Sequence, residues 1–283
     1  MTEEIAARDA YQQSVQSSVL EVRSDGGVVL DRTVFYPRGG GQPGDSGWLR
    51  WADREVEVID TVRREGAPVH VVRGDAPADG TTLTAEVDWD RRYLLMRTHT
   101  ALHALSGIIW RDYRAKVTGG NMQPGEARMD FELEGISTDF GREVEAKLNE
   151  ALTADHQVEI RFLSRLEALR DPDLIRTKVN LIPEAVDPIR VVDIVGLDRQ
   201  ADGGTHVRST AEVGEVRVTG TESKGKANKR IRISLLPPRP GEGREGGEAA
   251  PNLQVAQSAA AAGPPKKDDR SGRAERGREG AVP

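Results

Sequence analysis

The sequence predicts an α+β fold in which a small N-terminal β-barrel is followed by a domain of helices on an antiparallel sheet and by a disordered C-terminal tail. Three observations carry this prediction. Short β-rich runs alternate with turns in residues 1–87, an amphipathic helical pattern opens residues 88–236, and Gly, Pro, Ala and charged residues dominate residues 237–283. We take these three ranges as the domains, and we expect the last to be disordered because it cannot bury enough apolar surface to offset its ordering entropy.

The barrel is predicted from its β-rich segments. They read VLEV, VVLDRTVFY, WLRWA, VEVIDTV, VHVVR and LTAEVDW, and the turn signals DGG, GGGQPGDSG and GDAPADG stand between them. One turn holds the glycine run Gly39, Gly40 and Gly41, where glycine permits positive φ and close backbone approach. The run lacks the Gly-Lys-Ser/Thr ending of a nucleotide-binding loop, so a plain connecting loop and a ligand-facing loop both remain open.

The second domain begins with a helix. Apolar residues recur three and four positions apart across Asp88–Arg114, and Asp88 or Asp90 can cap the start. Further helices are expected near 139–153 and 165–170, and strands at ARMDFEL, VEIRFLS, IRVVDIV, EVRVTGTES and KRIRISLL. Helices therefore pack on an antiparallel sheet in this prediction.

Two pairs of potential metal ligands have identical spacing. His99 and His103 stand four apart on the predicted helix, so both imidazoles lie on one face. Asp202 and His206 are also four apart, and Gly203–Gly204 between them lets the backbone curl. A nitrogen-rich set with one carboxylate suits tetrahedral Zn²⁺, and we expect one zinc ion per chain.

The pattern also limits the chemistry. HTALH alone is more typical of packing or of a solvated surface, and it is the second pair that favours a metal site. Thr100 stands where the zinc-protease motif HExxH has its glutamate, which argues against proteolysis. With no cysteine and no Gly-x-Ser-x-Gly elbow in the chain, attack by water is the simplest hydrolytic route.

Composition points to a cytoplasmic protein. The 283 residues include no cysteine, the opening MTEEIAARDA lacks the features of a signal sequence, and no apolar run is long enough to span a bilayer. We expect no membrane insertion, and a monomer is favoured. A net charge of -6 argues against indiscriminate binding to nucleic acid. The basic run KGKANKRIR is either a phosphate-contacting loop or an ordinary charged hairpin.

Four motifs taken together resemble a known family. They are FYPRGGGQPGDSG, DWDRRYLLMRTHTALH, QADGGTHVRSTAEVG and ESKGKANKRIRI, in this order, within residues 9–235. They are similar to those of the AlaX alanyl-tRNA editing proteins, which are related to the editing domain of alanyl-tRNA synthetase. The resemblance implies tRNA as partner and hydrolysis, in trans, of the ester that joins a wrong amino acid to the terminal adenosine of tRNA(Ala). Serine is the first expected amino acid and glycine the second, because a second site that hydrogen-bonds the serine hydroxyl rejects alanine strongly.

The resemblance also implies roles for residues. It makes His99, His103, Asp202 and His206 the zinc ligands. Thr100 and the loop of Gly39, Gly40 and Gly41 would shape the amino-acid pocket, with the Thr100 hydroxyl the candidate contact for the substrate hydroxyl. The expected contacts to the rest of the substrate are Gln42, Lys224, Lys226, Asn228 and Arg230.

Two departures keep other functions in view. Asp202 stands where the family often has cysteine, and Val117 lies near the position of a glutamine in the synthetase editing domain. A carboxylate is a harder ligand than a thiolate. One alternative is therefore a noncatalytic protein that binds the tRNA end, and another is an editing hydrolase for a different aminoacyl-tRNA, such as an error product of threonyl-tRNA synthetase.

Overall fold

The computed structural model describes residues 2–177, 182–184, 186–225 and 227–237. Its fold class is α+β, as predicted, and the N-terminal barrel is present. The tail that the sequence predicts to be disordered lies outside the described residues, apart from Pro237. The domain boundary after residue 87 stays a prediction.

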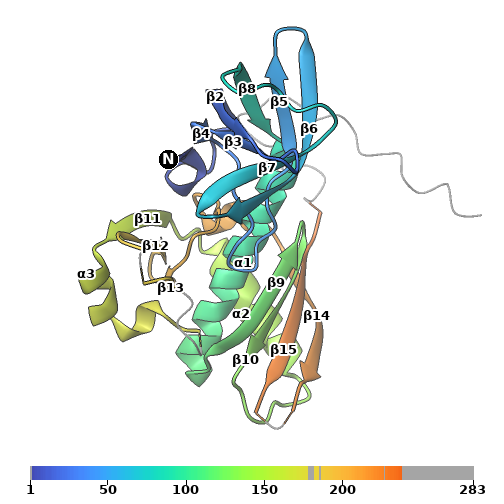
Figure 1. Ribbon diagram of the computed structural model, residues 1–283. Helices are drawn as coiled ribbons and strands as arrows, with labels where there is room; N and C mark the ends of the chain where they lie inside the picture. The colour runs from blue at the N-terminus through green and yellow to red at the C-terminus, as the bar shows by residue number, and fades with distance from the viewer. Residues whose placement is uncertain (1, 178–181, 185, 226, 238–283) are drawn as a thin grey trace, which may run out of the picture. The chain divides into compact units, whose positions relative to one another are not determined.

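The barrel is closed by six antiparallel strands in the order β2-β3-β7-β6-β5-β8 (Figure 1). The strands are β2 (Ser14–Val22), β3 (Val28–Leu30), β5 (Gly47–Trp51), β6 (Arg54–Arg64), β7 (Ala67–Arg73) and β8 (Thr82–Val87). Two short strands, β1 (Glu3–Glu4) and β4 (Arg32–Thr33), pair in parallel beside them, next to the 3₁₀ turn η1 (Ile5–Ala7). Inward residues alternate with exposed ones, as at Val56 and Val58 of β6, so the barrel has its own apolar core.

Helix α1 (Trp89–Tyr113) is the element on which the site is built. The Asp88 side chain caps its start by accepting from Arg91 N at 3.2 Å, and Arg114 ends it in the left-handed conformation. From Thr98 to Ile109 every residue is buried. A helix buried on all sides holds its side chains in fixed rotamers, which suits a site that needs exact placement.

The remaining strands form two antiparallel sheets rather than one. The first has the order β14-β15-β10-β9 and contains β9 (Val117–Gln123), β10 (Glu126–Phe131), β14 (Val216–Ser223) and β15 (Lys229–Leu235). The second consists of β11 (Val158–Leu163), β12 (Ile189–Ile194) and β13 (Asp198–Ala201). The other helical elements are α2 (Phe140–Thr153), α3 (Arg165–Arg170), η2 (Pro172–Leu174) and η3 (Thr210–Val213). The predicted helices at 139–153 and 165–170 are thus confirmed within a residue.

A buried ion pair joins the barrel to α1. Arg92 and Asp45 are each 1 % exposed, and Nε of Arg92 donates to Oδ2 of Asp45 at 2.9 Å. The same guanidinium donates to the carbonyl oxygens of Ala10 at 2.9 Å and Val34 at 2.6 Å. These contacts compensate the buried guanidinium and fix the barrel against the first turn of the helix, although Oδ1 of Asp45 is left without a hydrogen-bond partner among the described residues.

Among the described residues, none of the helices combines the length and the apolar character that crossing a bilayer requires.

Candidate metal centre

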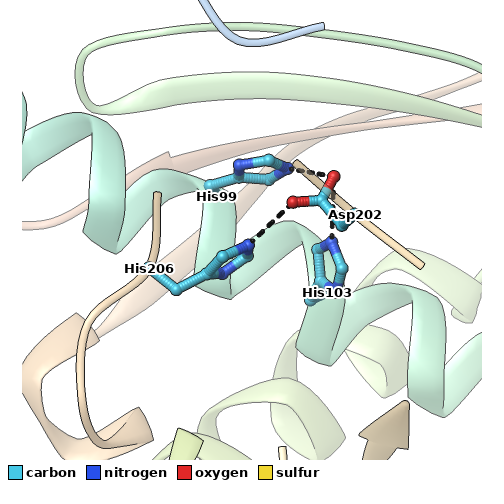
Figure 2. Close-up of side chains that lie close together, drawn as sticks. All are labelled: His99, His103, Asp202 and His206. Carbon is cyan, nitrogen blue, oxygen red and sulfur yellow. Dashed lines mark hydrogen bonds and ion pairs between the residues drawn. The ribbon is translucent and has the colours of Figure 1, made fainter. Parts of the chain in front are cut away.

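The four predicted ligands come together at one point. His99 and His103 project from one face of α1, and Asp202 and His206 come from the turn that follows β13 (Figure 2). Their ligand atoms all lie within 4.8 Å of one another, and the three imidazoles are buried. The cluster can hold a metal ion.

All three Nε2 atoms face the carboxylate of Asp202. Nε2 of His206 lies 3.2 Å from Oδ2, and Nε2 of His99 and of His103 lie 3.7 Å and 3.9 Å from Oδ1. Ligand atoms on a tetrahedral zinc ion are roughly 3.3 Å apart, because each bond is about 2.0 Å long. The spacing therefore needs only small shifts to close on one ion.

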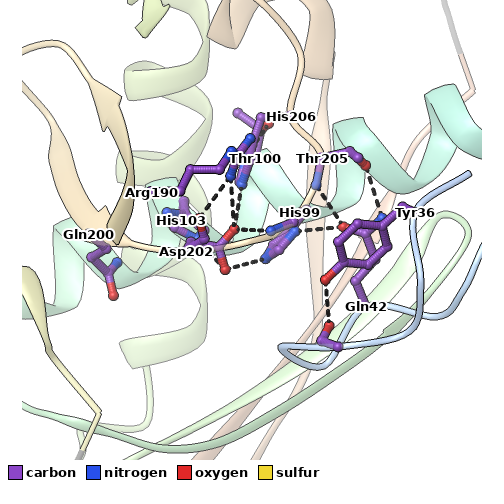
Figure 3. A network of polar contacts seen from close by, with 12 residues as sticks. Tyr36, Gln42, His99, Thr100, His103, Arg190, Gln200, Asp202, Thr205 and His206 are labelled. Carbon is purple, nitrogen blue, oxygen red and sulfur yellow. Dashed lines mark hydrogen bonds and ion pairs between the residues drawn. The ribbon is translucent and has the colours of Figure 1, made fainter. Parts of the chain in front are cut away.

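Each imidazole is held through its other nitrogen. Gln42 Oε1 lies 3.0 Å from Nδ1 of His99, and Thr100 Oγ1 lies 3.1 Å from Nδ1 of His206 (Figure 3). Asp198 Oδ2 makes an ion-pair contact with Nδ1 of His103 at 3.2 Å, without hydrogen-bond geometry. Outer partners of this kind fix ring orientation and leave Nε2 to the metal. The donor set and its supports fit a divalent ion.

The charge states also fit. Burial lowers the pKa of His99 to about 4 and holds the pKa of His206 well below its usual range. Burial works against ionisation of Asp202, yet the facing His99 and His206 hold the pKa of this carboxyl well below its usual range. For His103, the contacts with Asp198 and Asp202 outweigh burial and raise the pKa. His99 and His206 are thus held in the neutral form that binds a cation, whereas the raised pKa of His103 favours a proton that a bound cation would displace.

The turn that carries Asp202 depends on Gly204. A Cβ placed on Gly204 would lie 2.2 Å from Cε1 of His99, closer than any real contact. The backbone N–H of the same residue donates to Oδ2 of Asp202 at 2.6 Å. Gly203 meets nothing within 4 Å. Of the two glycines, only the second is required by contact with the site.

The glycine-rich loop of the barrel reaches this cluster. Gly40 and Gly41 have φ values of +57° and +84°, in the region that favours glycine. A Cβ on Gly40 would lie 3.7 Å from Oδ1 of Asp202, and the carbonyl oxygen of Gly41 accepts from Met122 N at 3.3 Å. The hydroxyl of Tyr36 donates to the carbonyl oxygen of Gly39 at 3.0 Å. The loop is thereby fixed between β9 and the metal centre.

A cavity of about 830 Å³ opens beside the cluster. His99, His103 and Asp202 form part of its wall, together with Gly40 and Gly41. The other described lining residues come mainly from β9, from the segment after η2 and from β12–β13, and many are apolar, as in Leu102, Val117, Met122, Leu174, Ile182 and Ile189. Pockets that bind small organic groups have this size and this mixture of apolar walls with a few polar groups.

Comparison with known proteins agrees with this arrangement. Residues 2–91 match the family model described as tRNA synthetases class II (A), and residues 189–232 match the model described as threonyl and alanyl tRNA synthetase second additional domain. The alanyl-tRNA editing protein AlaX-M of Saccharolobus solfataricus is 36% identical over 84% of this chain and 100% of its own length. The chain belongs to the AlaX family of alanyl-tRNA editing proteins.

Other relatives of this AlaX chain are longer. AlaX-L of Pyrococcus horikoshii is 33% identical over 83% of this chain and 58% of its own length. The alanine–tRNA ligase of Methanopyrus kandleri is 39% identical over 76% of this chain and 24% of its own length. The same fold therefore occurs alone and within larger proteins.

Besides the ligand His206, the predicted pocket residues Thr100, Gly39 and Gln42 of this AlaX chain are not among the described residues that line the cavity. Thr100 is fully buried, and its Oγ1 accepts from Val207 N at 3.3 Å besides contacting His206. Gln42 is 1% exposed and bonds His99 and Thr205. Their contacts support the metal ligands.

The predicted substrate contacts on the β14–β15 hairpin fall into different settings. Lys224 is exposed, with Glu222 at 3.3 Å, and Asn228 accepts from Oγ1 of the cavity-lining Thr118 at 3.1 Å. Arg230 donates twice to Asp130, each at 2.7 Å. Lys226 lies outside the described residues.

Sequence analysis missed several supporting residues. Asp198, Gln200 and Asp202 alternate along β13 and its end, a period-two signal that places them on one side of an extended chain. Nε2 of Gln200 donates to Oδ2 of Asp198 at 2.7 Å. Arg190 donates from Nη1 to the carbonyl oxygen of Asp202 at 2.8 Å, and it lines the cavity. The pairing of β12 with β13 that brings Arg190 here could not be read from spacing.

Proposed function

We propose that this AlaX-family protein is a trans-editing hydrolase that deacylates seryl-tRNA(Ala) and, as a second substrate, glycyl-tRNA(Ala). The observation that carries the proposal is the convergence of three imidazole Nε2 atoms and one carboxylate beside a cavity whose wall includes His99, His103 and Asp202 together with Gly40 and Gly41. The printed names of the relatives, which are alanyl-tRNA editing proteins, support the choice of tRNA.

We assign one zinc ion to His99, His103, Asp202 and His206. When bound, zinc supplies a positive charge that polarises an ester carbonyl or lowers the pKa of a water to about 7. The ligands from α1 lie in the stretch from Thr98 to Ile109, where every residue is buried, and those from the turn are held by Gly204 N and by Thr100. The protein thus holds the ion in a preformed site.

The amino-acid end of the substrate is assigned to the part of the cavity beside Gly40 and Gly41. Their backbone can approach a small polar group closely, because neither carries a side chain. The contacts of Thr100 favour a role in orienting His206, which leaves the loop backbone to recognise the serine hydroxyl. A site that hydrogen-bonds this hydroxyl leaves its own polar groups unpaired with alanine, so alanine is disfavoured; glycine also lacks the hydroxyl and therefore ranks below serine.

The tRNA end is assigned to the β14–β15 hairpin. Asn228 bonds Thr118 of the cavity wall, and the exposed Lys224 stands on the same hairpin. The basic run also contains Lys226. Arg230 already satisfies Asp130, so we assign it to shaping the sheet rather than to phosphate binding.

The test is release of labelled serine from seryl-tRNA(Ala), measured beside alanyl-tRNA(Ala) and beside His103→Ala. The proposal requires rapid release of serine, little release of alanine, and loss of activity in the variant. Binding of tRNA without any turnover would support the noncatalytic alternative. Preferential release from a mischarged tRNA(Thr) would assign the chain to threonyl errors.

A further inference from the structure

We infer that Gln42, in the barrel, is a positioning residue of the metal centre: its buried amide selects the ring tautomer in which His99 presents Nε2 to the metal. The inference rests on the metal site of the proposed function. It makes the loop that borders the cavity a structural part of that site.

Both the oxygen and the nitrogen of the Gln42 amide have partners. Oε1 accepts from Thr205 N at 3.0 Å and lies 3.0 Å from Nδ1 of His99. Nε2 donates to Oγ1 of Thr205 at 2.9 Å. The side chain is 1% exposed, so these partners are not exchanged for water (Figure 3).

These contacts determine where hydrogens lie. A backbone N–H can only donate, so Thr205 N must face the oxygen of the amide and not its NH₂ group. The oxygen can only accept, so Nδ1 of His99 must carry a hydrogen. In a neutral imidazole the lone pair then lies on Nε2, which faces Asp202 Oδ1 at 3.7 Å. The N–H of Thr205 thereby fixes the tautomer of His99 through Gln42.

Gln42 also links the glycine-rich loop that borders the cavity to the metal centre. Gln42 directly follows Gly41, which lines the cavity and whose carbonyl oxygen is bonded to Met122 N on β9. A shift of this loop therefore moves the amide that holds His99. Outer partners of metal-bound histidines typically change metal affinity 10–100-fold when removed.

The test compares three variants of the full chain. Gln42→Met keeps similar length without an acceptor, Gln42→Glu keeps an acceptor for Nδ1–H, and Gln13→Met changes an exposed glutamine. Nitrogen NMR of the metal-free protein reports which ring nitrogen of His99 carries the hydrogen. Competition with a chelator reports zinc affinity, and thermal unfolding of the metal-free proteins reports folding.

The wild type, Gln42→Glu and Gln13→Met should show His99 protonated on Nδ1, whereas Gln42→Met should lose this preference and bind zinc about 10–100-fold more weakly. A wild-type His99 protonated on Nε2 overturns the inference, and this measurement needs no variant. Equal losses of zinc affinity in Gln42→Met and Gln42→Glu would also overturn it, since they would indicate packing alone.

The tautomer is measured without metal or tRNA, so the inference and the proposed function fail separately. The expected tautomers and zinc affinities in a protein that releases no serine would support the inference and reject the hydrolase. Conversely, release of serine by the wild type, with the His99 tautomer and the zinc affinity unchanged in Gln42→Met, would support the hydrolase and reject the inference.

Discussion

Oδ2 of Asp198 lies 3.2 Å from Nδ1 of His103, the ring nitrogen that does not face Asp202. The Asp198 side chain is fully buried and also pairs with Arg176. It therefore serves the metal centre from outside the ligand set, because a carboxylate on Nδ1–H makes the imidazole a better donor to the metal.

Asp198→Asn should reduce zinc affinity about 10–100-fold, because a neutral amide orients His103 without strengthening it as a ligand. Chelator competition measures the change. Asp193→Asn is the control and should bind zinc like the wild type. Asp193 lies on the neighbouring strand β12, and its ion pairs with Arg199 and Arg161 are long, at 3.8 Å and 4.0 Å. Equal affinities in the two variants would remove Asp198 from the centre.

Gly204→Ala should abolish or greatly weaken metal binding, because the added methyl would lie 2.2 Å from Cε1 of His99. Gly203→Ala places a methyl in open space and should behave like the wild type. Zinc content after gel filtration measures both. The neighbouring glycines form a matched pair, and similar zinc contents would show that the turn accommodates the methyl.

His103→Ala should purify with much less than the near-stoichiometric zinc expected of the wild type, because one of four ligands is gone. Mass spectrometry of protein prepared without added metal gives the content. His156→Ala, which removes an exposed imidazole bonded to the Val195 carbonyl oxygen, should keep full content. Full occupancy in His103→Ala would contradict the ligand assignment.

Lys224→Ala should weaken tRNA binding and lower the slope of log affinity against log salt by about one, the value for one lost phosphate contact. Lys147→Ala is the control. It removes a lysine of α2 that is paired with Asp112, and it should leave the slope unchanged. Binding titrations at several salt concentrations measure it. A slope unaltered by Lys224→Ala excludes this residue from the tRNA interface.

His70 makes the barrel sensitive to acid. Burial lowers the pKa of His70 to about 4, while the unfolded chain titrates near 6.5. The unfolded state binds the proton first, so stability is lost as the pH falls from about 6.5 towards 4. Between pH 7 and pH 5, the free energy of unfolding of the wild type should fall by roughly 2 kcal/mol more than that of His70→Gln. Urea unfolding of both proteins at both pH values measures this difference.

The sequence predicted those features that follow from the spacing of residues close together in the chain. Helical spacing placed His99 and His103 on one face, and strand alternation predicted the barrel. Strand β9 was missed because VTGGNMQ contains two glycines and no alternation. The partners that orient the imidazoles were missed because Gln42 stands 57 positions from His99 and Asp198 lies far from His103 in the chain. Such contacts depend on the three-dimensional packing of barrel, helix and sheet.

The ion pair between Arg92 and Asp45 has a consequence for any attempt to shorten the protein. A fragment beginning at residue 88 would start one turn before a guanidinium that has lost Asp45, Val34 and Ala10 as partners. Water would solvate the freed guanidinium, so what the fragment loses is the set of contacts that holds the first helical turn in place. A functional miniature would therefore need new contacts that hold the first helical turn in place of those that Arg92 makes with the barrel.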